Sequence, residues 1–182
     1  MTTQTIDRPT LGTQRPWWML PALVVVLSVL GLLAYGLMAR GRGQLVDGPA
    51  PDFTLQSFAG EPVTLSELRG QPVILNFWAS WCRECDKEMR LLESSYQRYQ
   101  DEIVFLGIDY IDTEDKARAY LEQYGITYPN GPDLGSRIAN DYRIKGVPET
   151  FFIGKDGTVR GVHIGPLAQA DLEAWIEQLR NE

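Results

Sequence analysis

The sequence predicts an α/β protein in which helices flank a mixed central sheet, preceded by an apolar N-terminal helix. Two continuous apolar runs of strand length, residues 73–78 and 103–108, are typical of central strands covered on both faces. Residues 155–157 read Lys-Asp-Gly between two β-prone stretches and indicate an antiparallel hairpin. Strands that alternate with helical segments and end in a hairpin favour a sheet with mixed pairing.

The N-terminal segment contains an uncharged run from Trp17 to Ala39. A helix over this run, at about 1.5 Å per residue, can cross a hydrocarbon core of about 30 Å. Trp17 and Trp18 stand at its start, where interfacial aromatic residues belong. A cleaved signal peptide is the alternative, but its apolar core is shorter, and Leu37-Met38-Ala39 is a poor cleavage site. We therefore expect a cytoplasmic tail over 1–16 and an uncleaved transmembrane helix over 17–39.

A short Gly- and Pro-containing linker over residues 40–46 leads to a domain over 47–182. Two arginines precede the apolar run and two follow it, so the charge bias does not fix the orientation. Long downstream domains translocate largely regardless of flanking charge, and we expect a single-pass protein with a cytoplasmic N-terminus and an extracytoplasmic, periplasmic domain. The net charge of −7 argues against nucleic acid as a partner, because phosphate binding requires a basic surface.

Within the domain the predicted elements follow from apolar patterning and turn residues. In chain order we expect a hairpin over 53–55 and 63–65, a strand over 73–78, a helix after Cys85, a strand over 103–108, a helix through Tyr124 that Asp112-Thr113 caps and Gly125 ends, a short helix over 136–142, a hairpin over 150–153 and 158–162, and an amphipathic helix over 171–180.

The two cysteines of the chain, Cys82 and Cys85, lie three positions apart. They cannot staple a domain of this size, and with the single histidine, His163, they supply three ligands, whereas a structural zinc site usually needs four. A redox pair is therefore the favoured interpretation, with no metal and no bound cofactor. The alternative is that the two cysteines are incidental core residues. Three features argue against it: the preceding Trp81, the strand-to-helix junction, and the charged residues between the cysteines.

The cysteine pair follows a buried strand and is expected to open a helix, whose free N–H groups stabilise a thiolate. Cys82 is predicted to be the exposed nucleophile. Cys85 is predicted to be the buried resolving residue that attacks the mixed disulfide. Glu88, three residues later, is either an acid/base group beside Cys85 or a solvated helix carboxylate. Pro148 opens a strand, and composition alone predicts a trans peptide before it.

Two segments carry a resemblance to a known family. Asn76 to Cys82 reads Asn-Phe-Trp-Ala-Ser-Trp-Cys, and Gly146 to Thr150 reads Gly-Val-Pro-Glu-Thr. With these motifs the chain resembles the thioredoxin superfamily, in its membrane-anchored TlpA/ResA/CcmG (DsbE) branch, over residues 47–182. The resemblance implies a thioredoxin-like fold and a redox-active Cys82–Cys85 disulfide opposite a cis Pro148.

The resemblance also implies roles for other residues of the site. Glu88 matches an active-site acid, Glu149 matches a second acid, and Val147, with Trp81, is expected to contact the substrate, Val147 by strand addition. Asn76 stands where cytoplasmic thioredoxins carry a buried aspartate, which is typical of this branch. Glu84 replaces the proline that many members have before the second cysteine, which leaves the reduction potential and the direction of electron flow open.

The leading functional hypothesis is a protein-disulfide reductase of cytochrome c biogenesis. Its expected substrate is apocytochrome c or a respiratory copper-site protein, and the resemblance implies a membrane electron donor of the CcdA/DsbD type. An oxidase or isomerase that uses the same cysteines is the alternative. A peroxidase is disfavoured because Ala79 replaces the threonine of a Thr-x-x-Cys arrangement. A copper-binding chaperone would use Cys82, Cys85 and His163.

Overall fold

The computed structural model describes residues 19–40 and 43–182. It divides into two compact units, Met1–Arg42 and Gly43–Glu182. In the first, helix α1 spans Met19–Arg40. Among the described residues, no helix combines the length and the apolar character that a membrane crossing requires. The transmembrane helix predicted over 17–39 is therefore not confirmed. The predicted tail 1–16, residues 17 and 18, and linker residues 41 and 42 lie outside the described residues.

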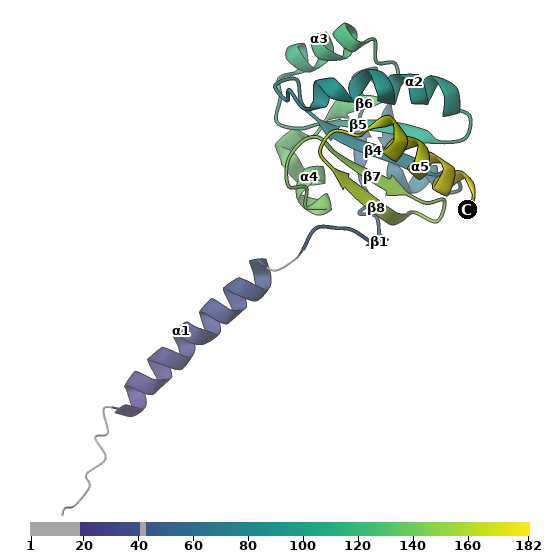
Figure 1. The fold of residues 1–182 in the computed structure, drawn as a ribbon. Helices are drawn as coiled ribbons and strands as arrows, with labels where there is room; N and C mark the ends of the chain where they lie inside the picture. Colours follow the sequence, from purple (N-terminus) through teal and green to yellow (C-terminus); the bar gives the residue numbers. More distant parts are fainter. Residues whose placement is uncertain (1–18, 41–42) are drawn as a thin grey trace, which may run out of the picture. The chain divides into compact units, whose positions relative to one another are not determined.

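The second unit is built on a six-stranded sheet with the order β1-β8-β7-β4-β5-β6 (Figure 1). The strands span Gly48–Pro49 (β1), Val73–Trp78 (β4), Val104–Asp109 (β5), Asn130–Pro132 (β6), Glu149–Ile153 (β7) and Thr158–Ile164 (β8). β4 pairs in parallel with β5 and antiparallel with β7, and β7 pairs antiparallel with β8. The prediction of an α/β fold with a mixed sheet is confirmed.

A separate hairpin and several helices complete the unit. The hairpin pairs β2 (Thr54–Gln56) with β3 (Pro62–Thr64). The helices are η1 (Leu65–Leu68), η2 (Cys85–Lys87), α2 (Met89–Tyr99), α3 (Glu114–Tyr124), η3 (Leu134–Ser136), α4 (Arg137–Tyr142) and α5 (Gln169–Arg180). Gly125 ends α3 in the left-handed conformation that glycine adopts without steric cost, as the sequence predicts.

Alternate residues of β4 enter two different cores. Leu75 and Phe77 join the core beneath α4 and the β2 hairpin, where Tyr142 packs against Phe77. Ile74 joins the opposite core, where it lies with residues of α2 and α5 such as Leu92 and Ile176. All six residues of β4 are buried, because both faces of the strand are covered. The rigid end of this strand therefore positions the segment that follows it.

Candidate redox site

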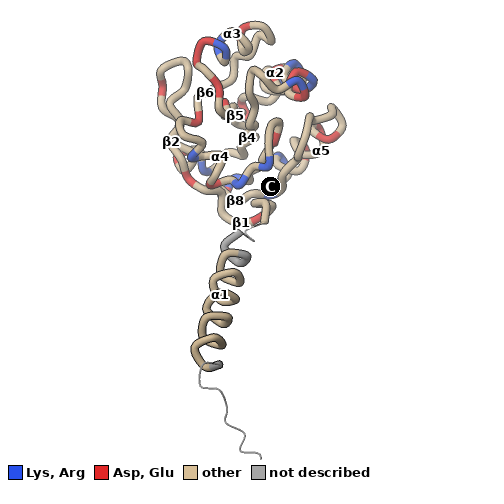
Figure 2. The backbone as a smooth tube through the Cα atoms, turned by 90° about the vertical axis from the view of Figure 1, so that its left-hand side faces the viewer, with Lys and Arg blue, Asp and Glu red and all other residues tan. Residues whose placement is uncertain are grey.

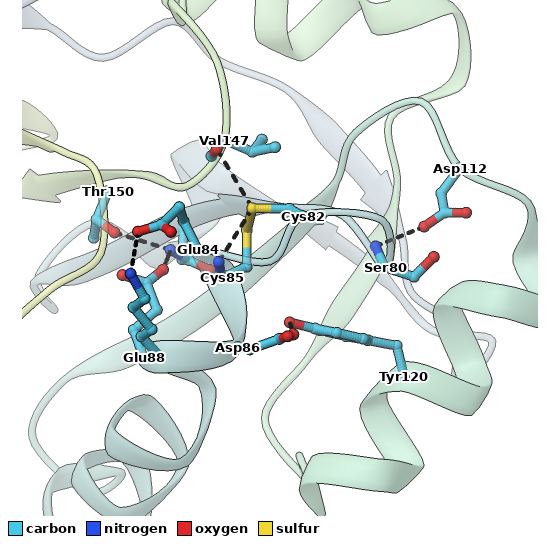
Figure 3. Close-up of a disulfide and its surroundings, with 12 residues drawn as sticks. Ser80, Cys82, Glu84, Cys85, Asp86, Glu88, Asp112, Tyr120, Val147 and Thr150 are labelled. Atoms are coloured by element: carbon cyan, nitrogen blue, oxygen red, sulfur yellow. Dashed lines mark hydrogen bonds and ion pairs between the residues drawn. A yellow bond between two sulfur atoms is a disulfide. The ribbon is translucent and has the colours of Figure 1, made fainter.

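The cysteine pair lies just beyond the buried end of β4, where Cys82 and Cys85 form a disulfide (Figure 3). The pair was expected to open a helix, and only Cys85 does so. Cys82 sits in a turn, Cys85 begins the short 3₁₀ helix η2, and α2 begins only at Met89. The charged residues 83–84 form part of this turn. The hydrogen bonding of a regular α-helix therefore begins only after Cys85.

The two sulfur atoms have unequal surroundings. Cys82 is 6% exposed to solvent and Cys85 is fully buried. Cys82 is thus the more exposed of the two, as predicted, although its exposure is lower than expected. The backbone N–H of Cys85 lies 3.1 Å from Sγ of Cys82 and points at it. The carbonyl oxygen of Val147 lies 3.4 Å from the same sulfur. In the reduced protein the Cys85 N–H would stabilise a thiolate at Cys82, because a free N–H is a good partner for an anion.

Two contacts hold the loop before Cys82 against the segment that follows β5. The N–H of Ser80 donates to Oδ2 of Asp112 at 2.7 Å, and the indole N–H of Trp81 donates to the carbonyl oxygen of Ile111 at 3.0 Å. Asp112, expected to cap α3, therefore holds the redox loop, and Thr113 makes no side-chain cap bond. Trp81 is 58% exposed and forms part of the surface beside the disulfide.

The sheet brings a segment 65 residues away to the disulfide. The Val147–Pro148 peptide is cis, whereas composition alone favoured trans. Glu149, the first residue of β7, pairs with Phe77 near the end of β4, which places residues 147 and 148 beside the turn that carries Cys82. The carbonyl oxygen of Pro148 accepts a hydrogen bond from Gly165, so the loop is fixed from the β8 side as well.

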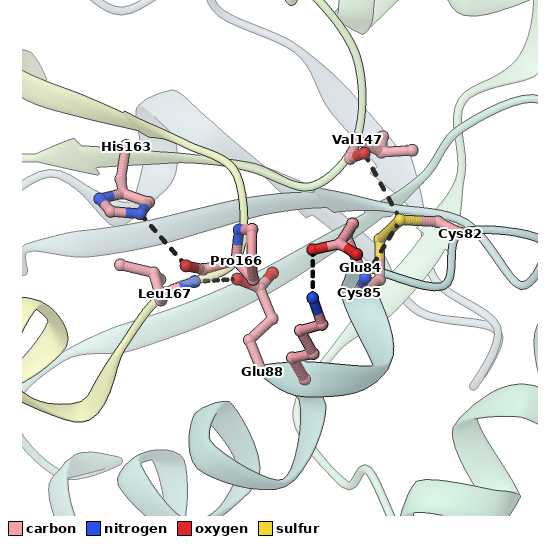
Figure 4. Close-up of polar contacts among 9 residues, drawn as sticks. Cys82, Glu84, Cys85, Glu88, Val147, His163, Pro166 and Leu167 are labelled. Carbon is pink, nitrogen blue, oxygen red and sulfur yellow. Dashed lines mark hydrogen bonds and ion pairs between the residues drawn. A yellow bond between two sulfur atoms is a disulfide. The ribbon is translucent and has the colours of Figure 1, made fainter.

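Glu88 is fully buried and is not the solvated helix carboxylate that was the alternative. Its Oε1 accepts from Nδ2 of Asn76 at 2.8 Å, and its Oε2 accepts from the N–H of Leu167 at 2.6 Å (Figure 4). Burial raises the pKa of Glu88 to about 7, despite these two bonds, which act in the opposite direction. Asn76 also donates to the hydroxyl of Thr150, so it links Glu88 to β7.

Glu149 is fully buried and directly follows Pro148 in the chain. Its Oε2 accepts from the N–H of Lys145 at 2.9 Å, and its Oε1 accepts from the side chain of Gln44. Burial raises the pKa of Glu149, while the bonds from Lys145 and Gln44 lower it. The segment that precedes the sheet thus contacts the second predicted acid.

Sequence reasoning missed two contributors to the site, Asp109 and Asp112. Asp109 closes the apolar run of β5 and is buried, and burial together with the nearby charge of Asp112 raises its pKa to about 7. An aspartate at the carboxyl end of a central parallel strand was the available signal, since such ends commonly line sites. Neither residue belongs to the motifs around the cysteines.

His163 does not join the cysteines. It lies in β8, opposite Thr150, and its Nε2 lies 3.3 Å from the carbonyl oxygen of Pro166 (Figure 4). Within residues 19–40 and 43–182, no three His, Cys, Asp or Glu side chains are grouped so that they could hold a metal ion. The geometry gives no support to the copper-chaperone alternative.

With this geometry, comparison with known proteins identifies the family. Residues 46–162 match the AhpC/TSA family. The chain belongs to this family. The Thr-x-x-Cys arrangement of a peroxidase requires a threonine hydroxyl at position 79. This chain has a buried Ala79 there. The redox centre is instead the cysteine pair.

Relatives of known name agree on the type of chemistry. The thiol-disulfide oxidoreductase ResA of Bacillus cereus is 29% identical over 159 residues, which cover 86% of this chain and 92% of that protein. The thioredoxin-like protein YneN of Bacillus subtilis is 27% identical and covers 85% and 93% of the two chains. The predictions of a thioredoxin-like family and of a thiol–disulfide oxidoreductase are confirmed.

Solved structures show the same fold. A thiol:disulfide interchange protein of the thioredoxin family from Chlorobium tepidum has a TM-score of 0.66 and 29% identity, covering 72% of this chain and 95% of its own. A secreted disulfide oxidoreductase of Mycobacterium tuberculosis, described as homologous to E. coli DsbE, has a TM-score of 0.64 at 24% identity, covering 70% and 96%. At that identity the second likeness shows the fold alone.

Proposed function

We propose that this protein reduces disulfide bonds of other proteins outside the cytoplasm, with Cys82 as nucleophile and Cys85 as resolving residue. The observation that carries the proposal is the asymmetry of the pair. Cys82 has the residual exposure and receives the Cys85 N–H, while Cys85 is enclosed. A nucleophile must reach its substrate, whereas a resolving thiol needs to reach only the mixed disulfide.

The reaction transfers two electrons and two protons. The Cys82 thiolate attacks one sulfur of the substrate disulfide and releases the other as a thiolate, which takes up a proton. Cys85 then loses its proton and attacks Sγ of Cys82, which releases the second substrate thiol and leaves the Cys82–Cys85 disulfide. Glu88, whose pKa is raised to about 7 and which follows Cys85 by three residues, is the proposed acceptor of the Cys85 proton.

The loop around Pro148 is the proposed docking site for the substrate chain. The Val147 carbonyl oxygen faces Sγ of Cys82 at 3.4 Å and so lies where a bound extended segment would pass. Such a segment can add to the backbone of the loop by strand addition, with exposed Trp81 beside it. Glu149, held by Gln44 and Lys145 next to Pro148, is a proposed site acid that contributes negative charge behind the loop.

The proposed substrates are apocytochrome c or a respiratory copper-site protein, and the proposed donor of electrons is a membrane protein of the CcdA/DsbD type. The single-pass anchor over 17–39, the cytoplasmic tail 1–16, the linker 40–46 and the domain 47–182 belong to the same proposal. This part rests on the sequence, in which residues 17–39 carry no charge, and on the likeness to ResA. Carbonate extraction of membranes, with protease accessibility of the domain, tests it.

Trapping the substrate tests the proposed function. In Cys85→Ser the mixed disulfide at Cys82 cannot be resolved, so the partner should remain covalently attached and be identified by mass spectrometry. Cys82→Ser is the matched control, because it lacks the nucleophile and should trap nothing. Equal trapping by both variants, or by neither, contradicts the assigned roles.

The alternative of an oxidase or isomerase uses the same two sulfur atoms. The reduction potential of the Cys82–Cys85 pair separates the two directions, measured against a glutathione or dithiothreitol buffer. A potential near that of a strongly oxidising protein such as DsbA, about −120 mV, excludes the reductase.

A further inference from the structure

A hollow of about 360 Å³ lies next to the redox loop. It is lined by Asp109, Ile111, Asp112, Pro132, Asp133, Leu134, Gly135 and Ser136. Ile111 and Asp112 also bind Trp81 and Ser80, so the wall of the hollow is the segment that holds the loop in front of Cys82 (Figure 3). A substrate chain docked at the disulfide can therefore reach this hollow with a neighbouring side chain.

The lining carries three carboxyl groups and no basic side chain, and acidic positions lie beside the β5 and β6 labels in Figure 2. Asp112 and Asp133 each accept hydrogen bonds from two backbone N–H groups. Asp109 differs from both. It is 2% exposed, and its Oδ1 is buried without a donor among the described residues. A buried carboxylate oxygen without a donor is costly, so this group is poised to accept one from a ligand.

The rim of the hollow is apolar. Ile111 and Leu134 are 59% and 80% exposed, and both are lining residues. A metal ion does not suit the site, because the three carboxyl groups of the lining are not placed to hold one ion together, nor is any other set of three such side chains among the described residues. A lysine or arginine side chain suits the hollow, because its methylene groups can pack on the apolar side chains while its charged end reaches further.

We infer that the hollow is a recognition subsite for a lysine or arginine of the substrate protein that lies close to the target disulfide. The stem packs on Ile111 and Leu134, and the ammonium or guanidinium group donates to Asp109. This inference rests on the proposed function for its substrate. Asp109 acts here as a binding residue and takes no part in sulfur exchange.

Two peptides test the subsite. Each has one intramolecular disulfide, and its two flanking positions carry either arginine or citrulline, which has nearly the same shape without the charge. The dithiol form of the full-length protein is mixed with each peptide in stopped flow, and the second-order rate constant is read from tryptophan fluorescence. Wild-type protein should react about tenfold faster with the arginine peptide, the effect of one charge-assisted hydrogen bond. Asp109→Asn should remove this preference.

Asp115→Asn is the matched control, since it removes the same charge from an exposed position on α3. It should keep the preference for arginine. Asp109→Asn should fold, because no described residue donates to the oxygen that it alters, and urea unfolding checks this. Equal rates for the two peptides in wild-type protein, or a preference that survives Asp109→Asn, overturn the inference.

A second measurement separates this inference from the proposed function. Binding of a linear, cysteine-free arginine peptide to the oxidised protein is followed by fluorescence anisotropy, and it needs no redox step. If neither disulfide peptide reacts, the proposed function fails. In that event, loss of binding in Asp109→Asn but not in Asp115→Asn still supports the subsite, and absence of binding to wild-type protein refutes it.

Discussion

Replacing Glu88 by glutamine should change how the stability of the protein depends on pH. Burial raises the pKa of Glu88 from 4.5 to about 7. Each pKa unit corresponds to about 1.4 kcal/mol, so ionised Glu88 destabilises the folded state by about 3 kcal/mol relative to its neutral form. The folded protein binds the Glu88 proton more tightly than the unfolded chain. The contribution of this group to stability is therefore fully present below pH 4.5 and is lost as the pH rises through about 7.

Glutamine has the same size and cannot ionise. Its carbonyl oxygen can accept from Leu167, but its amide group would then face Nδ2 of Asn76, which is also a donor, so the Asn76 bond is lost. This loss lowers the stability equally at every pH and leaves the pH dependence to the carboxyl group that was removed. The free energy of unfolding of Glu88→Gln should therefore fall less between pH 5 and pH 8 than that of wild-type protein, by about 2.5 kcal/mol. Asp109 also has a raised pKa, so some decline remains in both proteins.

Urea unfolding of the oxidised full-length protein, followed by tryptophan fluorescence at several pH values, measures this difference. Glu84→Gln is the control, because Glu84 lies in the same turn with an exposed side chain. Parallel pH profiles for wild-type and Glu88→Gln protein would refute the assignment of a raised pKa. They would also remove the basis for Glu88 as proton acceptor, which requires a pKa near neutrality.

Three further substitutions test the fold around the site. Gly107→Ala should destabilise the protein by at least about 2 kcal/mol in urea unfolding, because a Cβ there would lie 1.6 Å from Oδ1 of Asn130. Asp133→Ala should cost about 1–2 kcal/mol, because the Asp133 carboxylate accepts from both N–H groups at the start of α4. Arg180→Ala should leave the thermal midpoint unchanged within error, since its ion pair with Glu102 is solvent-exposed.

The helices and strands of the domain could be predicted wherever the sequence shows an apolar run or a turn residue. The apolar run of β4, the glycine after α3 and the Lys-Asp-Gly turn between β7 and β8 each have a local physical cause. β1 and β6 had none, because they read Gly-Pro and Asn-Gly-Pro, which are turn residues without an apolar pattern. They exist because neighbouring strands present free backbone groups to them.

The sequence predicted the cysteine pair and two acids of the site, Glu88 and Glu149, but not the contributions of Asp109 and Asp112. The two cysteines and Pro148 are recognisable as motifs, whereas Glu88 accepts a hydrogen bond from Leu167, which lies 79 residues further along the chain. Asp112 resembled a helix cap, because a cap and a loop anchor both use a carboxylate before a helix. Contacts between segments far apart in sequence decide between such alternatives, and a single sequence does not contain them.

The contact between Gln44 and Glu149 bears on where the domain can be cut. Gln44 precedes the predicted domain start at residue 47, yet it donates to a buried carboxylate beside Pro148. A soluble version that begins at Asp47 would remove this donor and leave Glu149 with only the Lys145 N–H. Soluble fragments that begin at Gly43 and at Asp47 would therefore differ in the charge behind the substrate loop, although both retain every cysteine. Gln44, which lies in the predicted linker, is in this sense a component of the candidate site.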